Sequence, residues 1–131
     1  MAVKISNRYV VDGSFLLAFL LPDEHTKQVD TFFEQLKTIN IVLIAPTILP
    51  YEVVNGIRFA VKSKRLDQAL ATKLIRVYLD LPVSLLSVDY GHVYTLSRKH
   101  NLTVYDASYL WLAKTKHIEL LTLDKTLHNL L

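Results

Sequence analysis

The stretch YVVDGSFLLAFLLPDE, residues 9–24, places a carboxylate inside an otherwise apolar run. Asp12 follows two valines, and Gly13 and Ser14 separate it from the apolar residues that come next. Burying an unpaired charge destabilises a fold by several kcal/mol, so such a residue needs hydrogen-bonding or ionic partners. We therefore expect Asp12 to lie at the carboxyl end of a buried strand, directly before a helix.

Strand-like and helix-like segments alternate along the whole chain. The patterns predict strands at 8–11, 41–45, 83–88 and 119–123, and helices at 14–20, from 23 or 26 to 36, 47–63, 67–81, 90–100, 106–116 and 125–131. Thr47 is the predicted cap of the third helix. Aliphatic strands that alternate with helices favour a parallel sheet covered on both faces. We predict one α/β domain over residues 1–131, with a three-layer α/β/α fold and a central parallel sheet flanked by helices.

Composition excludes several kinds of protein. The chain has 51% hydrophobic residues and no cysteine, so it is globular and contains no disulfide and no thiolate metal site. Pro22 and Pro46 interrupt the two most apolar stretches, and we expect neither a membrane span nor a signal peptide. A cytoplasmic location fits these features. The five histidines show no close metal-ligand spacing, which disfavours zinc.

Three aspartates and one glutamate stand in positions that suggest a site. Asp12 and Asp124 each follow a predicted strand, and Asp106 opens the predicted central helix. Helix capping is the simplest interpretation of each aspartate taken alone. Glu52 lies inside a helix on a largely apolar stripe, where its structural alternative is an ion pair with Arg58 or a lysine.

Taken together, the four acids favour a metal site. Carboxylates gathered at one sheet edge repel and raise one another's pKa values, and a hard cation such as Mg²⁺ relieves that repulsion. Carboxylate-bound Mg²⁺ in a small α/β domain suggests phosphate-ester chemistry. The net charge is +3, and Lys62, Lys64, Arg65 and Lys125 are candidate contacts to a nucleic-acid backbone, although an ordinary solvated face explains each of them equally well.

Four sequence blocks resemble a known family. VVDGS, PYEVVN, LTVYDASYLWLA and LLTLD occur in this order across nearly the whole chain. This arrangement resembles the PIN domain and, within it, the VapC-type toxins of prokaryotic toxin–antitoxin pairs. The resemblance implies an endoribonuclease that depends on Mg²⁺ or Mn²⁺, forms a homodimer and is inhibited by a small antitoxin protein.

The resemblance also assigns roles to residues. It places the acidic quartet, catalytic and metal-binding, on Asp12, Glu52, Asp106 and Asp124, and supporting hydroxyls on Ser14 and Thr122. Gly13 stands where the family more often has Ala, Thr or Ser, and Lys125 follows Asp124 where some members have a further acid nearby.

Two other interpretations remain open. A non-catalytic PIN-like module that binds RNA or protein would use the same acids as helix caps. A phospho-accepting receiver domain has a similar size, but its acceptor Asp should follow a mid-chain strand, and here Pro46 and Thr47 follow that strand.

Overall fold

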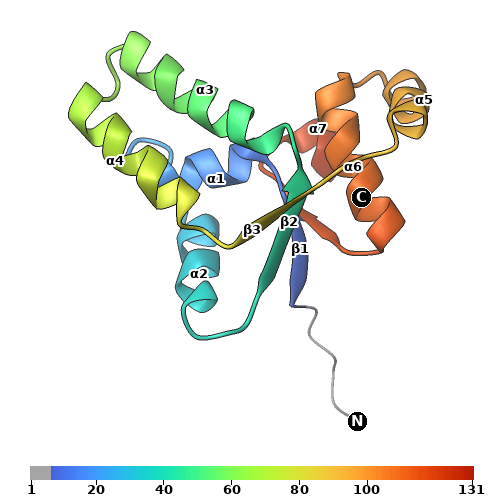
Figure 1. Cartoon of the computed structure of the whole chain (residues 1–131), viewed down its shortest axis with the longest axis horizontal. Helices are drawn as coiled ribbons and strands as arrows, with labels where there is room; N and C mark the ends of the chain where they lie inside the picture. Colours follow the sequence, from blue (N-terminus) through green and yellow to red (C-terminus); the bar gives the residue numbers. More distant parts are fainter. Residues whose placement is uncertain (1–6) are drawn as a thin grey trace.

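The computed structural model describes residues 7–131, so the first six residues of the predicted domain lie outside it. Strands and helices alternate along the chain: β1 (Arg8–Val11), α1 (Gly13–Leu20), α2 (Lys27–Leu36), β2 (Val42–Pro46), α3 (Leu49–Lys62), α4 (Gln68–Leu79), β3 (Val83–Leu86), α5 (Tyr90–His100), α6 (Val104–Lys116), β4 (Glu119–Leu121) and α7 (Lys125–His128). Figure 1 shows this arrangement in the colours of the sequence.

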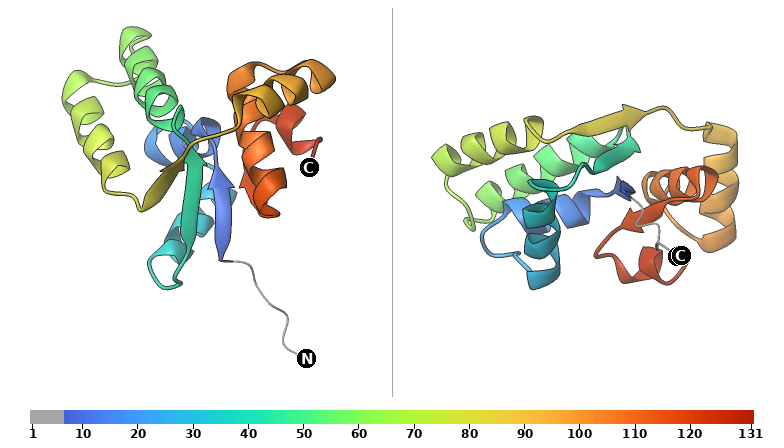
Figure 2. Two further views of the ribbon diagram at one scale, coloured as in Figure 1. Left: turned by 45° about the vertical axis from the view of Figure 1, so that its right-hand side comes forward. Right: turned by 90° about the horizontal axis from the view of Figure 1, so that it is seen from below.

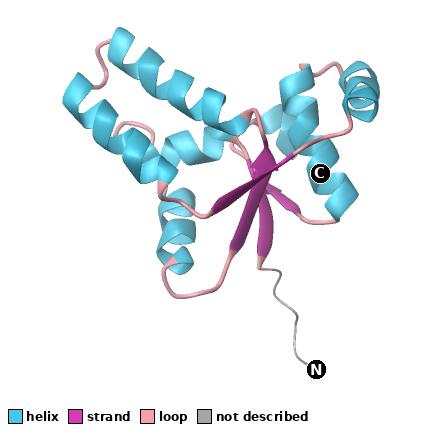
Figure 3. Cartoon of the chain, viewed as in Figure 1, coloured by secondary structure: helices cyan, strands magenta, loops and turns pink. Residues whose placement is uncertain are grey.

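The four strands form one parallel sheet in the order β3-β2-β1-β4. Val10 pairs with Ile44 on one side and with Leu120 on the other, so β1 is an inner strand, and its last two residues, Val10 and Val11, are buried. Helices lie on both sides of the strands, which Figure 3 shows by colour. The predicted three-layer α/β/α fold with a central parallel sheet is therefore confirmed.

Helices α1 to α4 cover one side of the sheet, while α5 and α6 lie on the other (Figures 1 and 2). The central helix α6 contacts β1, β2 and β4, and its buried face includes Leu110 and Leu112. Helix α1 is apolar on most of its surface because it packs between α2, α3 and α4. Within residues 7–131, no helix has both the length and the apolar character needed to cross a membrane.

Helix starts differ from the sequence predictions at two places. Thr47 is not the cap of α3, because the N-cap position falls on Ile48, which makes no side-chain capping bond. Thr103, rather than Asp106, caps α6 by accepting a hydrogen bond from the Asp106 amide at 3.1 Å. Asp106 is therefore the third residue of its helix, and its carboxylate is not used as the cap.

Two glycines allow α1 and α3 to approach closely. A Cβ atom on Gly56 would lie 2.4 Å from a Leu17 methyl group, so this position of α3 has room only for glycine unless Leu17 moves. A Cβ on Gly13 would lie 3.2 Å from the Glu52 Cβ. Gly13 therefore leaves Glu52 space beside the start of α1, and a side chain at this position would require a shift of a few tenths of an ångström.

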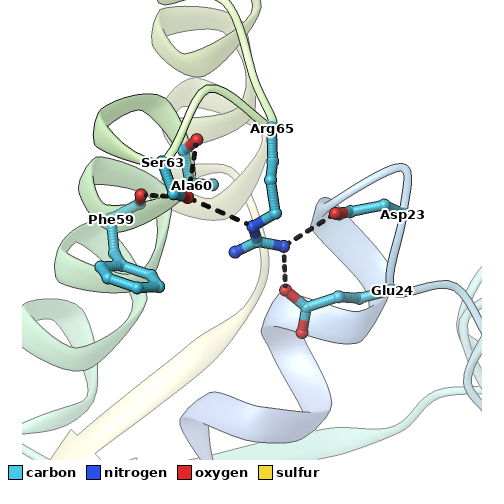
Figure 4. Close-up of polar contacts among 6 residues, drawn as sticks. All are labelled: Asp23, Glu24, Phe59, Ala60, Ser63 and Arg65. Atoms are coloured by element: carbon cyan, nitrogen blue, oxygen red, sulfur yellow. Dashed lines mark hydrogen bonds and ion pairs between the residues drawn. The ribbon is translucent and has the colours of Figure 1, made fainter.

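An ion-pair cluster joins the α3–α4 turn to the segment after α1 (Figure 4). Arg65 Nη1 lies 2.8 Å from Asp23 Oδ2 and 3.2 Å from Glu24 Oε2, and its Nε donates to Ser63 Oγ. The sequence suggested Arg65 as a contact to nucleic acid. In the folded chain its guanidinium forms ion pairs with two carboxylates of the same chain.

Candidate active site

Asp12 lies at the carboxyl end of β1 and begins α1. Its Oδ1 accepts hydrogen bonds from the Phe15 amide at 3.1 Å and from Ser14 Oγ at 2.7 Å. Its Oδ2 accepts a hydrogen bond from the Thr122 hydroxyl, which comes directly after β4. Asp12 is therefore a helix cap, as one interpretation of the sequence predicted, and both hydroxyls expected beside it are in contact with it.

The hydroxyls that hold Asp12 also organise the turn after β4. Thr122 Oγ1 accepts a hydrogen bond from the Asp124 amide at 3.0 Å, and Ser14 Oγ accepts one from the Leu123 amide at 3.0 Å. Asp124 then caps α7 by accepting from the Leu127 amide at 3.1 Å. These hydrogen bonds link the ends of the neighbouring strands β1 and β4, and so fix the position of Asp12 relative to Asp124.

Glu52 lies on α3 and reaches the partner helix α6. Its Oε1 accepts a hydrogen bond from the Tyr109 hydroxyl at 2.5 Å. The sequence suggested Arg58 or a lysine as the structural partner of Glu52, but the partner is this tyrosine. Tyr109 comes three residues after Asp106 and so lies on the same helix face, a spacing that could have indicated its place in the site.

Electrostatics connects all four acids. Burial is the main cause that raises the pKa values of Asp12, Glu52 and Asp106. The charge of Asp106 raises the pKa of both Asp12 and Glu52, and the charge of Asp124 raises that of Asp106. Asp12 is only 5% exposed, and this burial raises its pKa. Three hydrogen bonds to its carboxylate lower the pKa but do not offset the effect of burial.

The donor set suits a hard divalent cation. Four carboxylates supply only oxygen ligands, which Mg²⁺ and Mn²⁺ prefer. Among residues 7–131, no ion pair joins any of the four to a basic side chain. In that same part of the chain, no three acidic or histidine side chains stand close enough together to hold one ion. In this arrangement the Asp12 carboxylate accepts hydrogen bonds from the hydroxyls of Ser14 and Thr122. The Glu52 carboxylate accepts one from the hydroxyl of Tyr109.

Removing the Tyr109 hydroxyl should weaken activity through Glu52. Its hydrogen bond favours the charged carboxylate, so Tyr109→Phe should raise the pKa of Glu52 further. We expect the RNA cleavage that the family resemblance implies to fall roughly 10- to 100-fold, the usual effect of losing such a supporting contact, and to fall more at acidic pH than at neutral pH. A pH–rate profile measures this. Tyr78→Phe is the control, since Tyr78 is also buried but forms no hydrogen bond to any of the four acids within the described chain. If Tyr109→Phe lowers the cleavage rate by the same factor at every pH, the proposed role of Tyr109 is contradicted.

The fold and the acids together define a class of small α/β domains with a carboxylate site at the carboxyl edge of a parallel sheet. Comparison with known proteins identifies the family within this class. The chain belongs to the PIN domain family, whose model matches residues 9–130.

Individual relatives agree with this assignment. The chain is 29% identical over 124 residues to the protein named ribonuclease VapC3 from Pyrobaculum aerophilum, and the match covers 92% of each chain. The crystal structure of PAE2754 from the same organism superimposes with a TM-score of 0.73 at 24% identity, covering 92% of this chain and 82% of that one. Mycobacterium tuberculosis VapC20, described as a sarcin–ricin loop cleaving toxin, gives a TM-score of 0.65 at 15% identity, with 93% and 94% covered.

Proposed function

We propose that this protein is a metal-dependent endoribonuclease of the VapC type, the toxin component of a type II toxin–antitoxin system. The observation that carries the proposal is the placement of four acids at the carboxyl edge of a PIN-family sheet: Asp12 and Asp124 directly follow β1 and β4, Glu52 lies beside Gly13, and Asp106 lies in the first turn of α6. The name of the relative ribonuclease VapC3 supports hydrolysis of RNA.

Asp12, Asp106 and Asp124 would hold Mg²⁺ or Mn²⁺ directly or through bound water, and Glu52 would bind a metal-coordinated water or orient the attacking one. When bound, the metal polarises the phosphate, lowers the pKa of a bound water and stabilises the leaving oxygen. The chain's own contribution is positional: Ser14 and Thr122 fix both oxygens of Asp12, while Tyr109 holds Glu52. Hydrolysis in this way leaves a 5′-phosphate and a 3′-hydroxyl.

We assign contacts to the RNA phosphate backbone to three lysines at different places in the fold. Lys62 ends α3, Lys64 follows in the turn before α4, and Lys125 begins α7 directly after Asp124. We place Arg65 outside this set because of its ion pairs with Asp23 and Glu24. A cognate antitoxin, a homodimer and a cytoplasmic location complete the proposal by analogy with VapC proteins.

Metal dependence is the direct test of the proposed function. Purified protein should cleave defined single-stranded RNAs in Mg²⁺ or Mn²⁺ and should lose that activity in EDTA. Restoring either metal after EDTA should restore cleavage, because the ligands are carboxylates that the chelator leaves in place. Cleavage that persists in EDTA, or no cleavage under any condition, would contradict the assignment.

A non-catalytic RNA- or protein-binding module is the second candidate. One observation favours it: Asp12 and Asp124 do cap α1 and α7, so structural roles exist for both. This alternative predicts weak, salt-sensitive RNA binding that Asp12→Asn leaves unchanged, and no rise in melting temperature on addition of Mg²⁺.

A further inference from the structure

Three exposed tyrosines surround a hollow next to the acids. Tyr51, Tyr90 and Tyr105 are 75%, 72% and 58% exposed, which leaves large aromatic faces open. They line a pocket of about 210 Å³ together with residues that include Thr47 and Ser108. We call this hollow the tyrosine pocket; it lies where the first turns of α3, α5 and α6 approach one another, at the carboxyl edge of the sheet.

The tyrosine pocket continues toward Glu52. A second hollow of about 340 Å³ shares Tyr51 and Tyr105 with it and is also lined by Glu52 and Asn55. In the sequence, Tyr51 directly precedes Glu52 and Tyr105 directly precedes Asp106. A ligand that extends from the pocket past these two tyrosines therefore reaches Glu52 within one continuous surface.

The lining of the pocket suits a flat, neutral, aromatic ligand. Among residues 7–131, no charged residue lines it, whereas three tyrosines, aliphatic residues such as Val93, and Thr47 do. The Ser108 hydroxyl donates to the Tyr105 carbonyl at 2.6 Å, which fixes the turn that carries Tyr105. The volume is below the roughly 300–1,000 Å³ of sites for drug-sized molecules, so the pocket has room for about one ring system.

We infer that the tyrosine pocket binds a nucleobase of the RNA strand whose phosphate lies at the four acids. The inference rests on the proposed function, since it takes RNA as the substrate, and it adds where an adjacent base is held. Any base can stack on a tyrosine ring because every base has an aromatic face. The pocket therefore contributes to the affinity for RNA and to the position of the strand, but not to sequence specificity.

A second copy of this chain is the competing occupant. Twofold contacts bring the same patch of both copies together, so a contact centred here would place Glu52 and Asp106 of each copy near those of the other. In the metal-free protein, like charges at that position oppose association. A concave pocket of this size also receives a single ring more readily than the surface of a folded domain, which favours the base.

The test compares two tyrosines of the same helix. Tyr90 lines the pocket, whereas Tyr94 is 57% exposed one turn later, does not line it, and lies below the Arg98 guanidinium at 5.9 Å. Binding of a fluorescein-labelled single-stranded RNA is measured in EDTA, where no cleavage is expected. Tyr90→Ala should weaken binding by about 5- to 150-fold, while Tyr94→Ala and Tyr90→Phe should leave it unchanged.

An abasic strand of equal length separates base contacts from backbone contacts. It should bind equally to the wild type and to Tyr90→Ala, because it lacks the group that stacks. Equal loss of RNA binding in the two alanine variants, or loss in neither, would overturn the inference. A third result would also overturn the inference: Tyr90→Ala binds RNA as tightly as wild type but has a different molecular mass by analytical ultracentrifugation. That result would identify the pocket as a contact between copies of the chain.

Failure of the proposed function gives a different pattern. If the wild type binds RNA through Tyr90 but cleaves no RNA in Mg²⁺ or Mn²⁺, the nuclease assignment fails while the base pocket stands. If the wild type cleaves RNA with metal and Tyr90→Ala binds as tightly as wild type, the nuclease assignment stands and the pocket inference fails.

Discussion

Asp12→Asn should lower metal-dependent RNA cleavage by at least about 100-fold while the protein stays folded. The substitution removes one negative charge from the proposed metal site but keeps an oxygen that can cap α1, since Asn and Asp are equivalent N-caps. The expected loss therefore reports on metal binding and not on the helix. Initial rates on a defined RNA, measured across a Mg²⁺ titration, would determine it.

A matched capping residue provides the control for this variant. Asp67 caps α4 by accepting from the Leu70 amide at 2.8 Å, but it is exposed and lies outside the acid cluster. Asp67→Asn should leave the cleavage rate within about twofold of wild type, because the cap is again preserved. Equal activity of Asp12→Asn and wild type would remove Asp12 from the site.

The same substitution should raise the melting temperature of the metal-free protein at neutral pH. Burial and the charge of Asp106 raise the pKa of Asp12, so the folded state holds its proton more tightly than the unfolded state does. The contribution of Asp12 to the free energy of unfolding is therefore largest below about pH 4, the ordinary pKa of Asp. It is lost as the pH rises through the higher pKa that Asp12 has in the folded state. Asn carries no charge and avoids this loss. For a domain of this size, each kcal/mol corresponds to roughly 2–5 °C.

Two measurements decide this prediction. The advantage of Asp12→Asn over wild type should shrink as pH is lowered toward about 4, and it should reverse when Mg²⁺ stabilises the wild type alone. Asp12→Ala is the control, because it relieves the charge but also loses the cap, which costs about 1 kcal/mol. If Asp12→Asn melts below wild type in EDTA at neutral pH, capping and hydrogen bonding outweigh the cost of burying the charge.

The sequence was informative about the architecture because its patterns are local. Two buried valines before Asp12 and the aliphatic run that became β2 are enough to predict parallel strands, and Pro22 correctly marks the end of α1. The last strand is shorter than its apolar pattern predicts. Thr122 leaves the ladder after Leu121, and its hydroxyl bonds to Asp12 instead.

Contacts between distant segments were less predictable. The partner of Glu52 is separated from it by 57 residues, and the carboxylates paired with Arg65 lie more than 40 residues before it. Residue type indicates that a buried carboxylate or a guanidinium needs a partner, but it does not identify the partner, because the fold brings the two together. The requirement for glycine at position 56 likewise depends on Leu17 of another helix.

The Asp12 cap makes one backbone amide a reporter of the site. The Phe15 N–H donates to the same carboxylate that Ser14 and Thr122 hold, and it is buried. Its proton resonance therefore senses any change in the charge or partners of Asp12. Titrating the protein with acid, with a divalent cation or with an RNA strand should move this one signal by different amounts, so a single amide spectrum can distinguish the three events without any enzymatic turnover.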